Sequence, residues 1–185
     1  MTTTVDRPAA IRRALRDLVA KNGFHGTSMS AVTAAAGVAA GTAYVHYESK
    51  ETLVHATYLE VKQDLADAVL EGLDPDAGPA ERYRQIWLAA HAHLEAEPER
   101  ARFLTQMEES PYYERAHALV LEQGDPLVEE AARPDIAELM VDLPIVAIYQ
   151  LSIGTAVRLV SAGIELTDEQ LRVFVDATWR AISRP

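Results

Sequence analysis

Two pairs of residues in the middle of the chain are of types that bind metals, and one of the pairs also has a suitable spacing. Glu114 and His117 are spaced so that both side chains lie on one face of a helix, as paired metal ligands do. One such pair is a weak signal without further carboxylates on facing helices, and His91 and His93 would point to different faces. The chain contains no cysteine, no Gly-rich phosphate loop, no nucleophile elbow and no HExxH motif. We therefore predict no enzyme, no catalytic residue, no metal and no cofactor.

A second group of side chains could form a binding pocket. Aromatic, imidazole and thioether groups with a few polar tips are the usual lining of a small-molecule site. The candidates for such a ligand site are Trp87, His91, Met107, Tyr112, Tyr113, His117 and Tyr149. The alternative is that most of them are ordinary core residues. Glu108 and Glu109, next to two of these tyrosines, hint at an amine-bearing ligand, although acidic runs usually face solvent.

The elements that must position these residues are helices. With 185 residues, 49% of them hydrophobic, and only nine glycines and nine prolines, the chain can bury a sizeable helical core. We expect about nine helices and short helical pieces over 125–142, hence an all-α fold. Eight helices are expected at 8–22, 29–35, 39–44, 49–70, 79–96, 98–109, 111–123 and 143–162. A ninth and final helix should begin at the capping box Thr167–Gln170.

Charge is distributed unevenly along this sequence. Residues 1–50 carry six Lys/Arg against three Asp/Glu, whereas residues 51–185 carry 11 against 25. The asymmetry suggests a basic head on an acidic body, although chance clustering would also explain it. No run of about 18 apolar residues indicates a membrane span, and the N-terminus has no apolar signal-peptide core. We expect a cytoplasmic protein without a membrane partner.

The most informative stretch is Gly23–Leu53. Two short helical segments, 29–35 and 39–44, are separated by a turn at Gly37, which is the helix-turn-helix pattern. Three alanines before Gly37 allow the two helices to approach closely, and Val38 can fill the angle between them. In this arrangement the first helix braces the second, which enters the major groove of DNA.

Short sequence motifs in the same stretch resemble the DNA-binding domain of the TetR family of bacterial repressors. They are Gly23-Phe24, Ala36-Gly37-Val38, Gly41-Thr42, Tyr44, His46-Tyr47, Ser49-Lys50-Glu51 and Leu53. The resemblance in motif covers about 45 residues. Beyond it, only the total length and the helical plan agree with the family.

The resemblance implies roles for matching positions. Tyr44 and His46 would reach phosphates, or a base edge in the case of His46, and Lys50 would neutralise a phosphate. Thr42 would bond a phosphate or touch a thymine methyl. The complete predicted DNA-binding set is Ser28, Met29, Ser30, Ala40, Gly41, Thr42, Tyr44, Val45, His46 and Lys50.

Two departures from the family pattern affect how this head would read DNA. Ala39 stands where the family often has serine, so a side-chain N-cap is lost. Residues 39–45 also contain no Arg, Asn or Gln for bidentate contacts to bases. We therefore expect few direct base hydrogen bonds. Specificity should rest on methyl contacts from Thr42, Val45 and Met29, on water and on DNA shape.

The remainder of the chain, residues 51–185, is expected to sense a ligand and to dimerise, whereas residues 1–50 form the DNA-binding head. Helix 49–70 would join the two as a lever. The last two helices are the natural dimer interface, with Tyr149, Gly154, Val157, Phe174 and Thr178 as candidates. The alternative is that helix 143–162 is buried within one chain.

The predicted function is a homodimeric transcription regulator. It would be a repressor that leaves a pseudo-palindromic DNA operator when a small-molecule effector binds. Two alternatives remain open at this point. One is a ligand-independent DNA-binding activator or accessory protein, and the other is a helical enzyme or carrier with a vestigial DNA-binding head.

Overall fold

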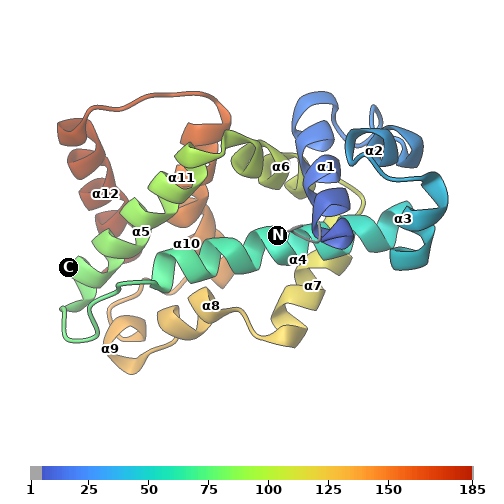
Figure 1. Cartoon of the computed structure of the whole chain (residues 1–185). Helices are drawn as coiled ribbons and strands as arrows, with labels where there is room; N and C mark the ends of the chain where they lie inside the picture. Colours follow the sequence, from blue (N-terminus) through green and yellow to red (C-terminus); the bar gives the residue numbers. More distant parts are fainter. Residues whose placement is uncertain (1–5, 185) are drawn as a thin grey trace, which may run out of the picture.

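The computed structural model describes residues 6–184, and most of this part of the chain is helical (Figure 1). It contains twelve helices and no strand, apart from one isolated bridge between Met140 and Ser183. The predicted all-α class is confirmed. The helices are α1 (Arg7–Asn22), α2 (Met29–Ala35), α3 (Ala40–His46), α4 (Lys50–Leu70), α5 (Pro79–Ala96), α6 (Pro98–Glu108), α7 (Tyr113–Gln123), α8 (Pro126–Ala131), α9 (Pro134–Ala137), α10 (Ile145–Leu151), α11 (Ile153–Ser161) and α12 (Asp168–Ile182).

Local capping interactions explain why several helices begin where the sequence predicts. Ser28 and Ser49 each accept a hydrogen bond at the start of α2 and α4. At the start of α12, Thr167 and Gln170 form the expected capping box. These interactions join residues three positions apart, so they can be recognised without knowing the fold.

The prediction of one continuous helix over 143–162 is wrong. The helix is interrupted at Ser152, whose backbone angles (φ −114°, ψ −107°) are not helical, and this separates α10 from α11. The Ser152 carbonyl accepts a hydrogen bond of 3.3 Å from the buried indole of Trp87 on α5. A Cβ at Gly154 would lie 2.9 Å from the Tyr149 carbonyl, so only glycine fits beside the break. This break and the two short helices α8 and α9 raise the count from the expected nine to twelve.

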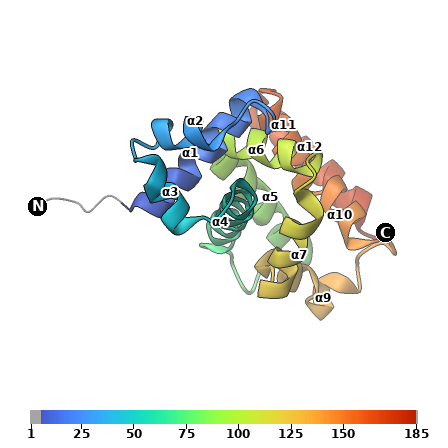
Figure 2. The ribbon, with the colours of Figure 1, turned by 90° about the vertical axis from the view of Figure 1, so that its right-hand side faces the viewer.

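Helix α4 is the structural axis of the molecule. It runs from the cluster of α1, α2 and α3 through the middle of the body, and Figure 2 shows it nearly end on, surrounded by other helices. The N-terminal helices share one continuous core with the body, since Ile11 and Leu15 of α1 belong to the same buried cluster as Trp87 and Ile182. The predicted boundary at residue 50 coincides with the start of α4 and is not marked by a gap in this core. No helix among residues 6–184 has the length and apolar character needed to cross a bilayer.

Candidate nucleic-acid interface

The turn between α2 and α3 has the geometry that a helix-turn-helix requires. Gly37 adopts φ +66°, a left-handed conformation that residues with a Cβ rarely adopt. Its amide donates to the Ala34 carbonyl (3.2 Å), and the Val38 amide donates to the Thr33 carbonyl (3.0 Å). These bonds end α2 and turn the chain into α3, which lies at the outer end of the head (Figure 1).

Helix α3 has one face in the core and one face in solvent. Ala43 is fully buried and Tyr47, which follows the helix, is only 8% exposed. By contrast, Tyr44 is 54% exposed and Val45 is 81% exposed. Tyr44 and Val45 therefore lie on a face of α3 that is free to contact another molecule.

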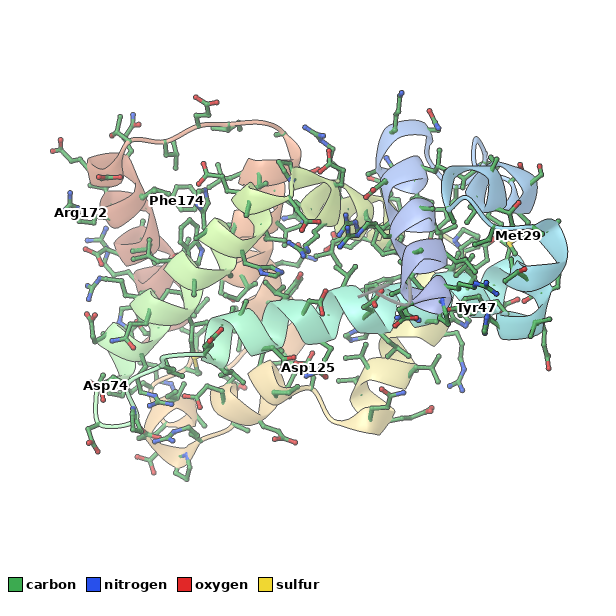
Figure 3. All side chains as sticks on the ribbon, in the orientation of Figure 1. Met29, Tyr47, Asp74, Asp125, Arg172 and Phe174 are labelled. Atoms are coloured by element: carbon green, nitrogen blue, oxygen red, sulfur yellow. The ribbon has the colours of Figure 1, made fainter. Side chains whose placement is uncertain are left out.

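The other predicted DNA-contacting residues lie on the same outer part of the head. Ser28 and Ser30 are exposed and their hydroxyls are 2.9 Å apart, while Met29 is half-buried between α2 and α3 (Figure 3). Ala40, Gly41 and His46 are exposed, whereas Thr42 and Lys50 are half-buried. The structure thus brings the ten predicted residues to one end of the molecule.

Gly41 is the residue of this surface that folding explains least. Its φ is not positive, and a Cβ built on it meets nothing within 4 Å. Neither backbone strain nor crowding within the chain therefore requires a glycine at this position. Its presence even weakens the helix, because the unfolded backbone of glycine is unusually free. A glycine on an open helix surface is suited to a close approach by the backbone of another molecule.

Lys50 has a structural contact that the sequence did not indicate. Its ammonium donates a hydrogen bond of 2.5 Å to the Phe24 carbonyl, which ties the start of α4 to the loop between α1 and α2. Burial lowers the pKa of Lys50. Two N–H groups remain available, so a phosphate contact stays possible in geometry, but the lysine also helps to hold the head together.

A charged brace connects the end of α3 to α1 and α4. Arg12 of α1 donates two hydrogen bonds to Glu60 of α4, at 2.8 Å and 2.6 Å, and a third to the Tyr47 hydroxyl at 2.7 Å. This planar two-point pairing fixes orientation better than a single ionic contact. Sequence reasoning missed the brace, because Arg12 and Glu60 are 48 positions apart and no local pattern links them.

The body contains two adjoining cavities that a small molecule could enter. The first, of about 110 Å³, has mainly apolar walls from α5, α8, α10 and α12. The second, of about 50 Å³, lies between α4, α7 and α10 and has more polar walls. We call them the apolar chamber and the polar chamber. The two share the wall residues Lys62, Asp125, Val128, Ile145 and Tyr149.

Only part of the predicted ligand set reaches these chambers. Tyr149 lines both, and Tyr113 and His117 line the polar chamber. Trp87 and Met107 are fully buried in the core and line neither.

The two other predicted ligand residues also lie outside the chambers. His91 is buried and stacks on Trp87, with ring centroids 5.5 Å apart. Tyr112 packs against Phe24 at 5.3 Å and therefore connects α7 to the head. The alternative to a ligand role was ordinary packing within the protein. This packing role accounts for Trp87, His91, Met107 and Tyr112.

The predicted dimer residues lie mostly inside their own chain. Gly154, Val157 and Thr178 are buried, and Thr178 accepts a hydrogen bond of 2.9 Å from the Tyr83 hydroxyl. Tyr149 faces the two chambers. These placements correct the expectation that they form a surface, because apolar periodicity identifies the face that packs on the same chain.

Phe174 is the one member of the predicted set that also borders the surface. It packs on Trp87 and lines a shallow groove on α12 together with Val173, which is 63% exposed. Figure 3 shows Phe174 on the inner side of α12. The exposed apolar side chains on the neighbouring helix α10 are Ile145, Val146 and Leu151.

Comparisons with known proteins agree with this geometry. Residues 11–57 match the family model described as bacterial regulatory proteins of the tetR family, and residues 79–183 match a tetracyclin-repressor-like C-terminal domain. A Haemophilus influenzae protein described as an uncharacterised HTH-type transcriptional regulator is 27% identical over 173 residues, covering 90% of each chain.

Solved structures show the same architecture over the whole chain. A TetR-family transcriptional regulator from Haemophilus influenzae Rd has a TM-score of 0.77 and 26% identity, with 100% of both chains covered. A TetR-family regulator from Marinobacter aquaeolei VT8 has a TM-score of 0.83 at 23% identity, covering 97% of this chain and 96% of that one, and so shares the fold. The chain therefore belongs to the TetR family of bacterial transcription regulators, whose members bind DNA, act as dimers and are regulators rather than enzymes.

Proposed function

We propose that this protein is a homodimeric repressor that leaves a pseudo-palindromic operator when a small-molecule effector binds in the body. The observation that carries the DNA-binding part is that α3 buries one face and exposes the other. Ala43 and Tyr47 anchor the helix, while Tyr44 and Val45 project into solvent. Residues 1–50 act as the reading head and residues 51–185 as the sensing and dimerising body. Such a regulator works in the cytoplasm, where its operator lies.

The proposed DNA-contacting set is the one that the sequence predicts. Tyr44, His46 and Lys50 approach phosphates, while Thr42, Val45 and Met29 touch thymine methyl groups. Because α3 offers no Arg, Asn or Gln between 40 and 46, direct readout is limited and DNA shape contributes much of the specificity. The remaining proposed contacts are Ser28, Ser30, Ala40 and Gly41.

Dimerisation uses the exposed apolar side chains of α10 and α12 in this proposal. Val173 of α12 and Val146 of α10 are at least half exposed, and burying them against a second copy removes apolar surface from water. A two-fold dimer presents two heads to half-sites about 34–36 Å apart along the DNA. Effector binding then favours a spacing of the two heads that no longer matches the spacing of the two half-sites on the DNA.

A chain of contacts offers a route from the chambers to the head. Tyr113 lines the polar chamber, and its neighbour Tyr112 packs on Phe24. The Phe24 carbonyl in turn holds the Lys50 ammonium at the start of α4. A ligand that moves the start of α7 therefore acts on the loop that positions α2 and on the first turn of α4.

The test uses an operator selected from random duplexes with the purified full-length protein. Tyr44→Ala should weaken operator binding roughly tenfold, because one charge-assisted contact is lost. The control is Ile164→Ala, which truncates a similarly exposed apolar side chain between α11 and α12. Fluorescence anisotropy at a fixed salt concentration measures both variants. Equal affinity of the Tyr44→Ala variant and the wild type would contradict the assignment of α3 as the reading helix.

A further inference from the structure

Lys62 and Asp125 form a buried ion pair in the wall that the two chambers share. Lys62 comes from the middle of α4 and Asp125 precedes α8, and their side chains are 10% and 6% exposed. Figure 3 shows Asp125 beside the middle of α4. Burying two charges is costly unless both have hydrogen-bond partners, so the partners of each side chain decide what the site can accept.

The three carboxylates that line the chambers have compensating partners. Asp125 is the N-cap of α8, and its Oδ1 accepts a hydrogen bond of 3.0 Å from the Leu127 amide. The first turn of a helix also stabilises negative charge. Glu108, in the wall of the polar chamber, lies 3.6 Å from the Arg158 guanidinium. Glu130, in the wall of the apolar chamber, is paired with the buried guanidinium of Arg82. None of the three carboxylates depends on a ligand for its charge balance.

The Lys62 ammonium is less well compensated. Its distance of 3.5 Å to Asp125 Oδ2 exceeds the length of about 2.7–2.9 Å that is usual for a charge-assisted hydrogen bond. The ammonium also lies over the ring of Tyr149, 5.3 Å from the centroid. Within residues 6–184 the ammonium donates no shorter hydrogen bond, although it carries three N–H groups.

The side chains around Lys62 are hydrogen-bond donors rather than further carboxylates. Burial raises the pKa of Tyr58 and Tyr149, so both remain neutral phenols that can donate an O–H. His117 lines the polar chamber, and its Nδ1 has no partner in the described part of the chain. Burial and the charge of Lys62 lower the pKa of His117, which favours the neutral imidazole.

We propose that the effector is an organic acid whose carboxylate binds the Lys62 ammonium and whose apolar body fills the apolar chamber. This inference rests on the proposed effector role of the chambers and names the chemical class of the ligand. The apolar chamber measures about 110 Å³, and apolar cavities of about 150 Å³ are known to hold benzene. The apolar chamber alone is smaller than a benzene cavity, but together with the adjoining polar chamber of about 50 Å³ it matches a benzene-sized body whose short acidic arm reaches the shared wall. An amine of the same shape would face the ammonium instead.

The experiment compares three probes that share one body and differ in the head group. They are 3-phenylpropionate, 3-phenylpropanol and 3-phenylpropylamine, titrated calorimetrically into the full-length protein without DNA. The acid should bind at least tenfold more tightly than the alcohol, and the amine more weakly than either, because only the carboxylate compensates Lys62.

Two substitutions locate the head-group site. Lys62→Met keeps the apolar stem and should weaken acid binding roughly 10- to 100-fold while leaving the alcohol unchanged. Asp125→Asn keeps the capping group of α8 and should tighten acid binding, because the competing carboxylate is gone. Lys21→Met removes an exposed lysine at the end of α1 and serves as the control. Thermal unfolding confirms that each variant is folded.

Stronger binding of the amine, no binding of any probe, or undiminished acid binding by folded Lys62→Met would overturn the proposal. Weaker acid binding by Asp125→Asn would overturn it as well. A second readout separates this inference from the proposed function. Acid binding that depends on Lys62 but leaves operator affinity unchanged supports the site and refutes effector release, whereas absence of operator binding by the ligand-free protein refutes the repressor role alone.

Discussion

Gly41→Ala should make the protein more stable and a poorer DNA binder at the same time. Gly41 is the second residue of α3, its φ is not positive, and the space beside it is open. Alanine stabilises helical positions by about 0.5–1 kcal/mol relative to glycine, chiefly because the unfolded chain loses freedom. For a chain of this size that corresponds to a rise in Tm of about 1–4 °C. The lower half of the range is expected, since α3 has only seven residues.

The loss of DNA affinity follows from the same open space. If duplex DNA lies close against α3, the added methyl group separates the two backbones by a fraction of an ångström and lengthens the neighbouring phosphate contacts. We expect at least a tenfold loss of operator affinity, which is about 1.4 kcal/mol. Circular dichroism during heating measures the stability, and fluorescence anisotropy measures operator binding at constant salt.

Gly78→Ala supplies the matched control. Gly78 also has open space around its Cβ position, but it caps α5 in the body. There alanine is a poorer N-cap than glycine, so stability should fall by a few tenths of a kcal/mol while DNA affinity stays unchanged. If Gly41→Ala bound the operator as tightly as the wild type, the assignment of Gly41 to the DNA-facing surface would be refuted. If it were destabilised, the helix-propensity argument would fail.

The remaining predictions concern pH and oligomeric state. Burial and the charge of Arg100 lower the pKa of His93 below its ordinary value of 6.5, so stability that is present above pH 6.5 is lost as the pH falls through the lower folded-state pKa. In urea titrations between about pH 7 and 5, His93→Gln should flatten this decline in the free energy of unfolding. The control is His25→Gln, which replaces an exposed histidine and should leave the decline unchanged. Parallel stability curves for the two variants would contradict the explanation. Val173→Glu should yield a monomer in sedimentation at micromolar concentration, because it places a charge in the proposed dimer surface. Val45→Glu, the same change at the exposed position of α3, should remain a dimer and lose DNA binding, and a dimeric Val173→Glu variant would exclude α12 from the interface.

The reading head could be predicted in detail because its determinants are local. The Gly37 turn and the Ser28 and Ser49 caps all join residues within five positions of one another. Such contacts form from the sequence order alone, so spacing and residue type suffice to recognise them. The same holds for the outward face of α3, because helical periodicity determines which positions share a side with Ala43.

The body could be predicted only as a set of helices. Trp87 has the residue type of a pocket wall, yet the fold places it in the core, where its indole bonds the Ser152 carbonyl 65 positions away. Val173 is an ordinary apolar residue of a helical segment, and only the packing of α12 shows that its side chain is exposed.

Sequence alone therefore determined the helical class, the helix-turn-helix and the side of α3 that faces outward. Tertiary structure decided where the chambers lie, which residues line them and which apolar side chains remain uncovered. Lys62 and Asp125 illustrate the reason: they meet across 63 positions, and no sequence motif marks either residue. Interactions between distant positions depend on how helices pack, and no spacing along the chain records that packing.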